Sequence, residues 1–267
     1  MAPVMRRLVA ASVLLAAGAG IGGCGKGQPT ASVTVTQGTS ATTTAQATKA
    51  SPTAPAQASS QAKTRARAFA NAVNLSANDL TGFTPSSEHS RHHETAREKH
   101  LGQELHACVG SGHGATQPLV EATSGEYERK GTLARQSVSS NVTVESSATL
   151  ATEDLTALRN SRVRSCLSLY FEHELAGVGS QGARVTKVST KYGSPPAPGT
   201  AGSFGLRITA TLTFHRLTLP FYVDYLGFVD GPAEVSLVSM GTPLPFPASA
   251  EEQLFSLLVE RAKTHSA

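Results

Sequence analysis

The sequence predicts an α+β fold, in which an antiparallel sheet packs with helices and one disulfide is present. The strongest observation is residues 204–214, where apolar side chains occupy every second position, as in a strand with one buried face. Residues 219–229 are apolar at nearly every position, which indicates a central strand covered on both faces. After a turn at residues 230–232, residues 233–240 return as a third strand of a meander near the C-terminus. Helical patterns are grouped around these strands rather than alternating with them, which disfavours a parallel doubly wound sheet.

The folded domain is expected to begin near Gln61 with an amphipathic helix. Its apolar side chains recur at helical spacing: Ala62, Ala66, Phe69, Ala70 and Val73. A second helix is predicted after Thr95, because Thr95 and Glu98 form a capping-box pattern. Its apolar stripe reaches Cys108, which should face inward, and Gly110 is well placed to end it.

A strand and two more helical stretches are expected between this helix and the meander. Residues 138–145 alternate between apolar and polar side chains, which predicts a half-buried strand. A helical stretch then opens at Thr152, and a following one carries Cys166. The two are interpreted as separate helices with a break near Ser161.

A final helix is predicted at the C-terminus, after a Pro-rich link. Ser249 and Glu252 give a second capping-box pattern. The side chains expected to be buried are Leu254, Leu257, Leu258 and Ala262.

The N-terminus has the pattern of a lipoprotein export signal. Arg6 and Arg7 precede an apolar run, and small residues follow up to Cys24, whose thiol is in place for lipid attachment. The apolar run of about 14 residues is short for a transmembrane helix, and an ordinary signal peptide has no use for a cysteine there. We therefore expect residues 1–23 to be removed and Cys24 to be acylated. The mature protein would then be anchored to membrane lipid on the extracytoplasmic face.

The following segment is expected to be a flexible tether. Residues 24–60 are dominated by Thr, Ala, Ser, Gln and Pro, with few large apolar side chains to offset the entropy of ordering. The predicted organisation is therefore a signal peptide at 1–23, a lipidated tether at 24–60 and one α+β domain at 61–267.

The cysteines agree with an oxidising compartment. With Cys24 taken for lipid, Cys108 and Cys166 remain as a pair that we expect to be bridged. Such a bridge would close a loop of about 60 residues and stabilise the fold by roughly 4 kcal/mol in the chain-entropy model. The alternative is two unrelated buried thiols, and a metal role is disfavoured because no CxxC spacing is present.

Charge and aromatic content disfavour nucleic acid as a partner. The formal net charge is +4, and it falls to about +2 when Arg6 and Arg7 leave with the signal peptide. The chain has no tryptophan and few other aromatic residues, so a base-stacking or sugar-stacking platform is disfavoured too.

The candidate ligand-binding residues are Tyr222, Asp224 and Tyr225. A carboxylate in a strand that is otherwise apolar on both faces is costly without a partner, and burial would raise the pKa of Asp224. The two tyrosines flank it and are candidates to line a small cleft. The alternative is an Asp224 that pairs with an arginine such as Arg207.

The sequence gives only weak signs of a metal site, a hydrolase nucleophile or a phosphate-binding loop. The polar stretch with His89, His92, His93 and His100 suggests a metal site, but such runs are more often solvated helix or loop, so no metal or other cofactor is predicted. Residues 201–205 imitate a hydrolase nucleophile motif but precede a strand, and we interpret them as a strand entry. Residues 110–114 imitate a phosphate loop without its GK[ST] ending, and we interpret them as a connection.

Four features together resemble a group of bacterial surface lipoproteins of unassigned function. They are the lipobox, the motif Asn74-Leu75-(x)3-Asp79-Leu80-(x)-Gly82-Phe83, the pair Cys108 with Cys166, and the closing strand–Gly-Pro–strand–helix unit. The pattern is similar to PsbP-like and LpqN-like domains and to PknH-type extracellular sensor domains, although the latter carry a second disulfide. The resemblance implies a curved antiparallel sheet between helices over residues 61–265 and transfers no catalytic residue.

The function expected from these observations is binding rather than catalysis. We predict a lipid-anchored, extracytoplasmic, sensor-type lipoprotein whose ligand is a small apolar molecule or an envelope protein. The alternatives are an envelope hydrolase that uses the histidines or Asp224, and a structural accessory subunit of a membrane complex.

Overall fold

The computed structural model describes residues 54–86, 96–109, 117–132, 134–177, 183–214 and 217–267. In chain order the elements are α2 (Ala54–Val73), the short 3-10 helix η2 (Ala77–Asp79), β1 (Thr84–Pro85), α3 (Ala96–Val109), β2 (Val120–Thr123), β3 (Tyr127–Lys130), β4 (Arg135–Val144), α4 (Ala148–Arg159), α5 (Ser161–Gly177), β5 (Ala183–Gly193), β6 (Gly202–Phe214), β7 (Leu217–Asp230), β8 (Ala233–Thr242) and α6 (Ala248–Thr264). The strands form one eight-stranded sheet in the order β1-β3-β4-β8-β7-β6-β5, with β2 paired to β4. All pairings are antiparallel, so the predicted α+β class is confirmed.

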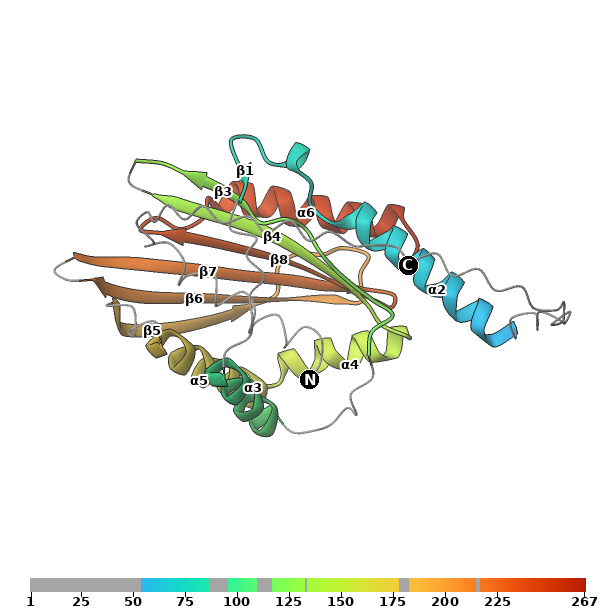
Figure 1. Cartoon of the computed structure of the whole chain (residues 1–267), viewed down its shortest axis with the longest axis horizontal. Coiled ribbons are helices and arrows are strands. Elements are labelled where there is room, and N and C mark those ends of the chain that lie inside the picture. Colours follow the sequence, from blue (N-terminus) through green and yellow to red (C-terminus); the bar gives the residue numbers. More distant parts are fainter. Residues whose placement is uncertain (1–53, 87–95, 110–116, 133, 178–182, 215–216) are drawn as a thin grey trace, which may run out of the picture.

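Helices cover both faces of this sheet (Figure 1). Helices α2 and α6 lie on one face and α3, α4 and α5 on the other. The first face buries Phe69 of α2 and Leu258 of α6 against Val142 and Phe228 of the sheet. The second face forms a separate apolar cluster, in which α3 and α5 pack on β6, β7 and β8. The sheet is therefore the middle of three layers.

The predicted meander is confirmed as β6, β7 and β8. Their register runs without a break, from Phe214 opposite Leu217 to Asp230 opposite Ala233. The turn between β7 and β8 contains Gly231 at a φ of 54°, a backbone conformation that glycine adopts without strain. Residues 201–205 enter β6, as expected.

Several strands were not predicted. Strand β5 has a register irregularity between Val185 and Lys187, so its apolar side chains Val185 and Val188 break the period of two. Strands β2 and β3 are four residues each and carry charged side chains, so they are too short for a periodic pattern. These strands depend on pairing with long neighbours rather than on their own sequences.

Strand β4 differs from the half-buried strand that its alternation predicted. Val138 and Val142 face the α2–α6 layer, and the polar residues Asn141 and Thr143 on the opposite side are buried as well. Alternation identifies the two sides of a strand, but it does not show whether the polar side reaches water.

The helix boundaries also differ in part from the predictions. The break between α4 and α5 falls at Asn160, next to the predicted Ser161. Helix α2 begins at Ala54, so residues 54–60, which we assigned to the tether, are helical. They are rich in alanine, the strongest helix former.

The capping box predicted at Ser249 is wrong. Helix α6 begins at Ala248, and its N-cap is Pro247, which makes no side-chain cap hydrogen bond. The fixed φ of Pro247, −64°, already suits a helix start. Of the side chains predicted to be buried, Leu254, Leu258 and Ala262 are in the core, and Leu257 is partly buried against it.

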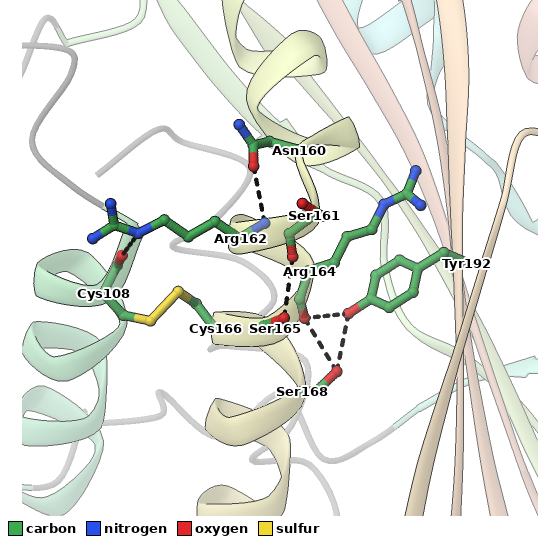
Figure 2. The surroundings of a disulfide bond; sticks show 9 residues. All are labelled: Cys108, Asn160, Ser161, Arg162, Arg164, Ser165, Cys166, Ser168 and Tyr192. Atoms are coloured by element: carbon green, nitrogen blue, oxygen red, sulfur yellow. Dashed lines mark hydrogen bonds between the residues drawn. A yellow bond between two sulfur atoms is a disulfide. The ribbon is translucent and has the colours of Figure 1, made fainter.

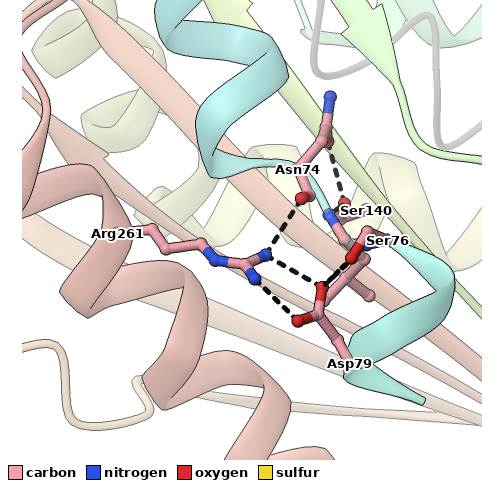
Figure 3. A network of polar contacts seen from close by, with 6 residues as sticks. Asn74, Ser76, Asp79, Ser140 and Arg261 are labelled. Carbon is pink, nitrogen blue, oxygen red and sulfur yellow. Dashed lines mark hydrogen bonds and ion pairs between the residues drawn. The ribbon is translucent and has the colours of Figure 1, made fainter.

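A network around Asp79 holds the segment after α2 against α6 (Figure 3). The Nη2 of Arg261 in α6 donates to Oδ1 of Asp79 at 2.6 Å, and Nη1 donates to Oδ2 at 2.9 Å. Nη1 also donates to the backbone oxygen of Asn74 at 3.1 Å, and Asn74 Oδ1 accepts from Ser140 of β4 at 2.8 Å. Because Asn74 and Asp79 belong to the motif that carries the family resemblance, that motif fixes how α2, α6 and the sheet meet.

The predicted disulfide is confirmed. It joins Cys108 near the end of α3 to Cys166 in α5 (Figure 2). Arg162 of α5 adds a hydrogen bond from Nε to the backbone oxygen of Cys108 at 3.1 Å. Leu105 of α3 and Leu167 of α5 are buried in the same cluster. The bridge therefore fastens α3, which follows a long segment, to a helix that packs on the sheet.

The double variant C108A/C166A should be less stable than the wild type by about 4 kcal/mol, because the bridge closes a loop with a sequence separation of 58. Urea unfolding followed by circular dichroism measures the loss. A reducing agent should destabilise the wild type and leave the double variant unchanged, and equal stability of the reduced and oxidised wild type would contradict the prediction.

The variant D79N should lose about 1–2 kcal/mol of stability at neutral pH, since the charged partner of Arg261 is removed. Burial alone would raise the pKa of Asp79, but hydrogen bonds from Arg261 and Ser76 outweigh it and lower the pKa below its usual 3.8. Because the pKa of Asp79 is lower in the folded protein than in the unfolded chain, its charge stabilises the fold at neutral pH. This contribution is lost as the pH falls below about 4. The urea midpoints of wild type and D79N should therefore converge in acid, while the exposed-site control E260Q follows the wild type throughout. A gap that is independent of pH would contradict the assignment.

Candidate functional site

The three predicted ligand-binding residues do not share one face of the sheet. Tyr222 and Asp224 project toward the α6 side, and Tyr225 projects to the opposite side, where it is buried beneath α5. Neighbouring residues of a strand point in opposite directions, so Tyr225 cannot line a cleft together with Tyr222. A ligand-binding role for these residues stays a prediction.

Asp224 is paired with Arg207, the alternative considered from the sequence. The two residues are direct cross-strand partners in the β6–β7 register. Arg207 donates from Nε to Oδ1 of Asp224 at 2.5 Å and from Nη2 to Oδ2 at 3.0 Å. Its Nη2 also lies 3.7 Å from Oε2 of Glu251 in α6, and Glu251 accepts a hydrogen bond from Ser239 of β8. The network therefore joins the sheet to α6, with one arginine placed against two carboxyl groups.

Tyr225 lines a small cavity between α5 and the sheet. The cavity measures about 10 Å³, close to the space that one water molecule needs. Its wall includes Arg164, whose guanidinium lies 5.1 Å from the ring centroid of Tyr192. Figure 2 shows how Tyr192 is held, with its hydroxyl donating to the backbone oxygen of Arg164 at 2.7 Å. The cavity is far smaller than pockets that hold organic ligands, which are about 300–1,000 Å³.

A group of three buried carboxylates lies on the same face of the sheet, near the turn between β7 and β8. Glu145 directly follows β4, Asp154 is in α4 and Glu234 is in β8. One oxygen of each lies within 4.8 Å of the other two. All three side chains are buried, with at most 8% exposure. The chain thus brings together acidic groups from three separate elements.

This acidic cluster is strongly perturbed. Burial raises the pKa of Glu145 to about 7, with further contributions from the negative charges of Asp154 and Glu121. Burial also raises the pKa of Glu234 far above its usual range, and the repulsion of Asp154 and Glu145 adds to it. Oε1 of Glu145 and both oxygens of Glu234 accept no hydrogen bond from any N–H or hydroxyl group that the structure describes. The cluster holds either protons or a cation.

Sequence reasoning missed this cluster, although part of the signal was present. Glu234 stands in a central strand, and the argument applied to Asp224 applies to it equally. Glu145 closes the polar side of the alternating strand, a side that was expected to face water. Nothing in the spacing links either residue to Asp154, because strand pairing and the docking of α4 bring them together.

The remaining predicted sites are only partly described. Cys24, the signal peptide and the histidines at 89, 92 and 93 lie outside the described residues. His100 is on the surface of α3, where its Nε2 lies 3.3 Å from Oε1 of Glu104. None of the described helices has both the length and the apolar character needed to cross a bilayer.

Comparison with known proteins adds little to this geometry. No protein-family model and no curated protein matches the chain. Among solved structures, the extracellular domain of PknH from Mycobacterium tuberculosis is similar at 12% sequence identity. The match covers 65% of this chain and 100% of that one, with a TM-score of 0.30. A TM-score this low supports no conclusion about fold or function.

The variant R207A should be more damaging than D224A, although both break the same ion pair. Asp224 has a side chain only 4% exposed, whereas that of Arg207 is 48% exposed and can be solvated alone. We expect R207A to cost about 3 kcal/mol, D224A less, and the double variant D224A/R207A less than their sum. Urea unfolding of the four proteins gives the coupling, and strictly additive losses would contradict the pairing.

Proposed function

We propose that this protein is a lipid-anchored, extracytoplasmic domain that binds a protein partner on its surface. The observation that carries the proposal is the exposure of two large apolar side chains, Leu217 and Leu244. At Tyr225, by contrast, about 10 Å³ of space leaves no room for a small apolar ligand. The disulfide supports an oxidising compartment. The sequence pattern ending at Cys24 supports the membrane anchor. The resemblance to PsbP-like, LpqN-like and PknH-type domains, taken from sequence motifs, agrees with a sensor or binding role.

Of the three large apolar side chains that are exposed in the described part of the chain, Leu169, Leu217 and Leu244, the last two mark a region suited to a protein partner. Leu217 and Leu244 are exposed by 56% and 58%. Strand β7 begins at Leu217, and Leu244 follows the end of β8. Because these strands are antiparallel neighbours, both leucines lie at the same end of the sheet. Two large apolar side chains in water at one end of a molecule favour a contact there.

Catalysis is the alternative, and it has less support. Asp224 is engaged by Arg207, so the carboxylate singled out for an envelope hydrolase is already neutralised. Turnover of generic ester or glycan substrates by the isolated protein would favour the hydrolase over a binding domain. A structural accessory role in a membrane complex would use the same kind of surface contact as the proposed function.

The proposal has two parts, a lipid anchor at Cys24 and a protein contact near Leu217 and Leu244, and each part needs its own experiment. Labelled palmitate should enter the wild type and not the variant C24A, which should leave the membrane fraction. A photo-crosslinking residue at position 217 or 244 should give one discrete adduct in cells, and the same residue at exposed position 260 should not. Adducts of equal yield at all three positions, or C24A that stays in the membrane fraction, would argue against the proposal.

A further inference from the structure

We propose that Glu145, Asp154 and Glu234 bind one divalent cation of the size of calcium between β4, β8 and α4. The geometric basis is the convergence of one oxygen from each side chain within 4.8 Å of the other two. The three ligands come from three elements, so a bound cation would tie α4 to the end of the sheet. The inference is independent of the proposed function.

A second observation distinguishes this cluster from an ordinary acidic surface patch. Glu234 is only 5% exposed and points into the cluster. Apart from the carboxyl of Asp154, no described N–H or hydroxyl group donates to either of its oxygens. Oε1 of Glu145 is also buried and accepts no hydrogen bond from the described residues. A buried carboxylate without a donor is costly, because the water it gave up is not replaced.

The other buried acids of the described residues show what is missing here. Glu128, Asp224 and Glu251 each lie within 4 Å of an arginine: Glu128 of Arg135, the other two of Arg207. The charges that act on Glu145 and Glu234 are instead all negative. Among the described residues, Glu145 and Glu234 thus differ from Glu128, Asp224 and Glu251, and a bound metal ion would supply the cation that those three already have.

The ligand chemistry selects the class of cation. All three donors are carboxylate oxygens, which suit hard ions such as Ca²⁺ and Mg²⁺ rather than Zn²⁺ or Cu²⁺. Calcium–oxygen distances of about 2.3–2.6 Å allow oxygens across the ion to be roughly 5 Å apart, whereas magnesium allows only about 4.2 Å. Oxygens that all lie within 4.8 Å of one another are within the span of a calcium ligand shell. A buried, all-protein site also suits calcium better than magnesium, because magnesium keeps several of its waters. Asn141, on the same side of β4 as Glu145, has a further buried oxygen, Oδ1, without a donor.

The test uses the full chain in its soluble C24A form, stripped with a chelator and then given calcium. Calcium at about ten times its dissociation constant should raise the Tm by about 3–5 °C, and equilibrium dialysis should find one ion per chain. The variant E234Q should bind no calcium, and its ion-free form should melt above the ion-free wild type because a buried ionisable group is gone. E172Q, which changes an exposed acid of α5, should behave as the wild type.

Each other result overturns the proposal. No bound calcium at about 10 mM, with E234Q still more stable than the ion-free wild type, would mean that the cluster holds only shared protons. Calcium binding that persists in E234Q would place the ion elsewhere. Should E234Q fail to fold, D154N replaces it with the same expectations, since Asp154 lies on a helix and not in the sheet.

Discussion

The eight-stranded sheet has helices on both faces, so a polar side chain on a central strand must find its partner inside the protein. Cross-strand register provides such partners. Arg207 stands directly opposite Asp224, and the pair lies under α6. There Glu251 of α6 lies close to Arg207 and accepts a hydrogen bond from Ser239. An unpaired carboxylate at the same place would cost several kcal/mol. The position of each buried charge is thus tied to the register of the sheet, and a slip of one residue would separate every such pair.

The two helical layers are fastened to the sheet by different means. Helices α2 and α6 come from distant parts of the chain, and the contact of Arg261 with Asp79 joins them across 182 residues of sequence. Helices α3 and α5 instead share a covalent bond between Cys108 and Cys166. Both the ion pair and the disulfide lie beside an extensive apolar cluster. Burial of apolar side chains already stabilises each helical layer, so these contacts fix how its helices are aligned.

The long periodic elements could be predicted from the sequence, and the short or irregular ones could not. Strand β6 and helix α6 show their period over ten or more residues, which defines both the element and its buried side. Strand β7 is apolar at nearly every position, which indicates a strand covered on both faces. Strand β5 loses its period at the irregularity after Val185, and β2 and β3 exist only through their pairing with β4. The same limit applies to the sites. Asp224 could be matched with Arg207 because both stand in a predicted hairpin, whereas the meeting of Glu145 and Glu234 with Asp154 depends on how α4 docks.

The acidic cluster lies under α4, a helix with few buried apolar side chains. Ala151 and Leu155 form a small cluster with Val229, and Leu158 joins the larger cluster that includes α5. Its C-terminal end is held by Arg159, which donates from Nη2 to the backbone oxygen of Ser203 at 2.8 Å. Mutual repulsion of the three carboxylates acts directly between this helix and the sheet, where little burial opposes it. The charge state of the cluster therefore has more influence on the position of α4 than on any other element, and a change there leaves both large cores intact.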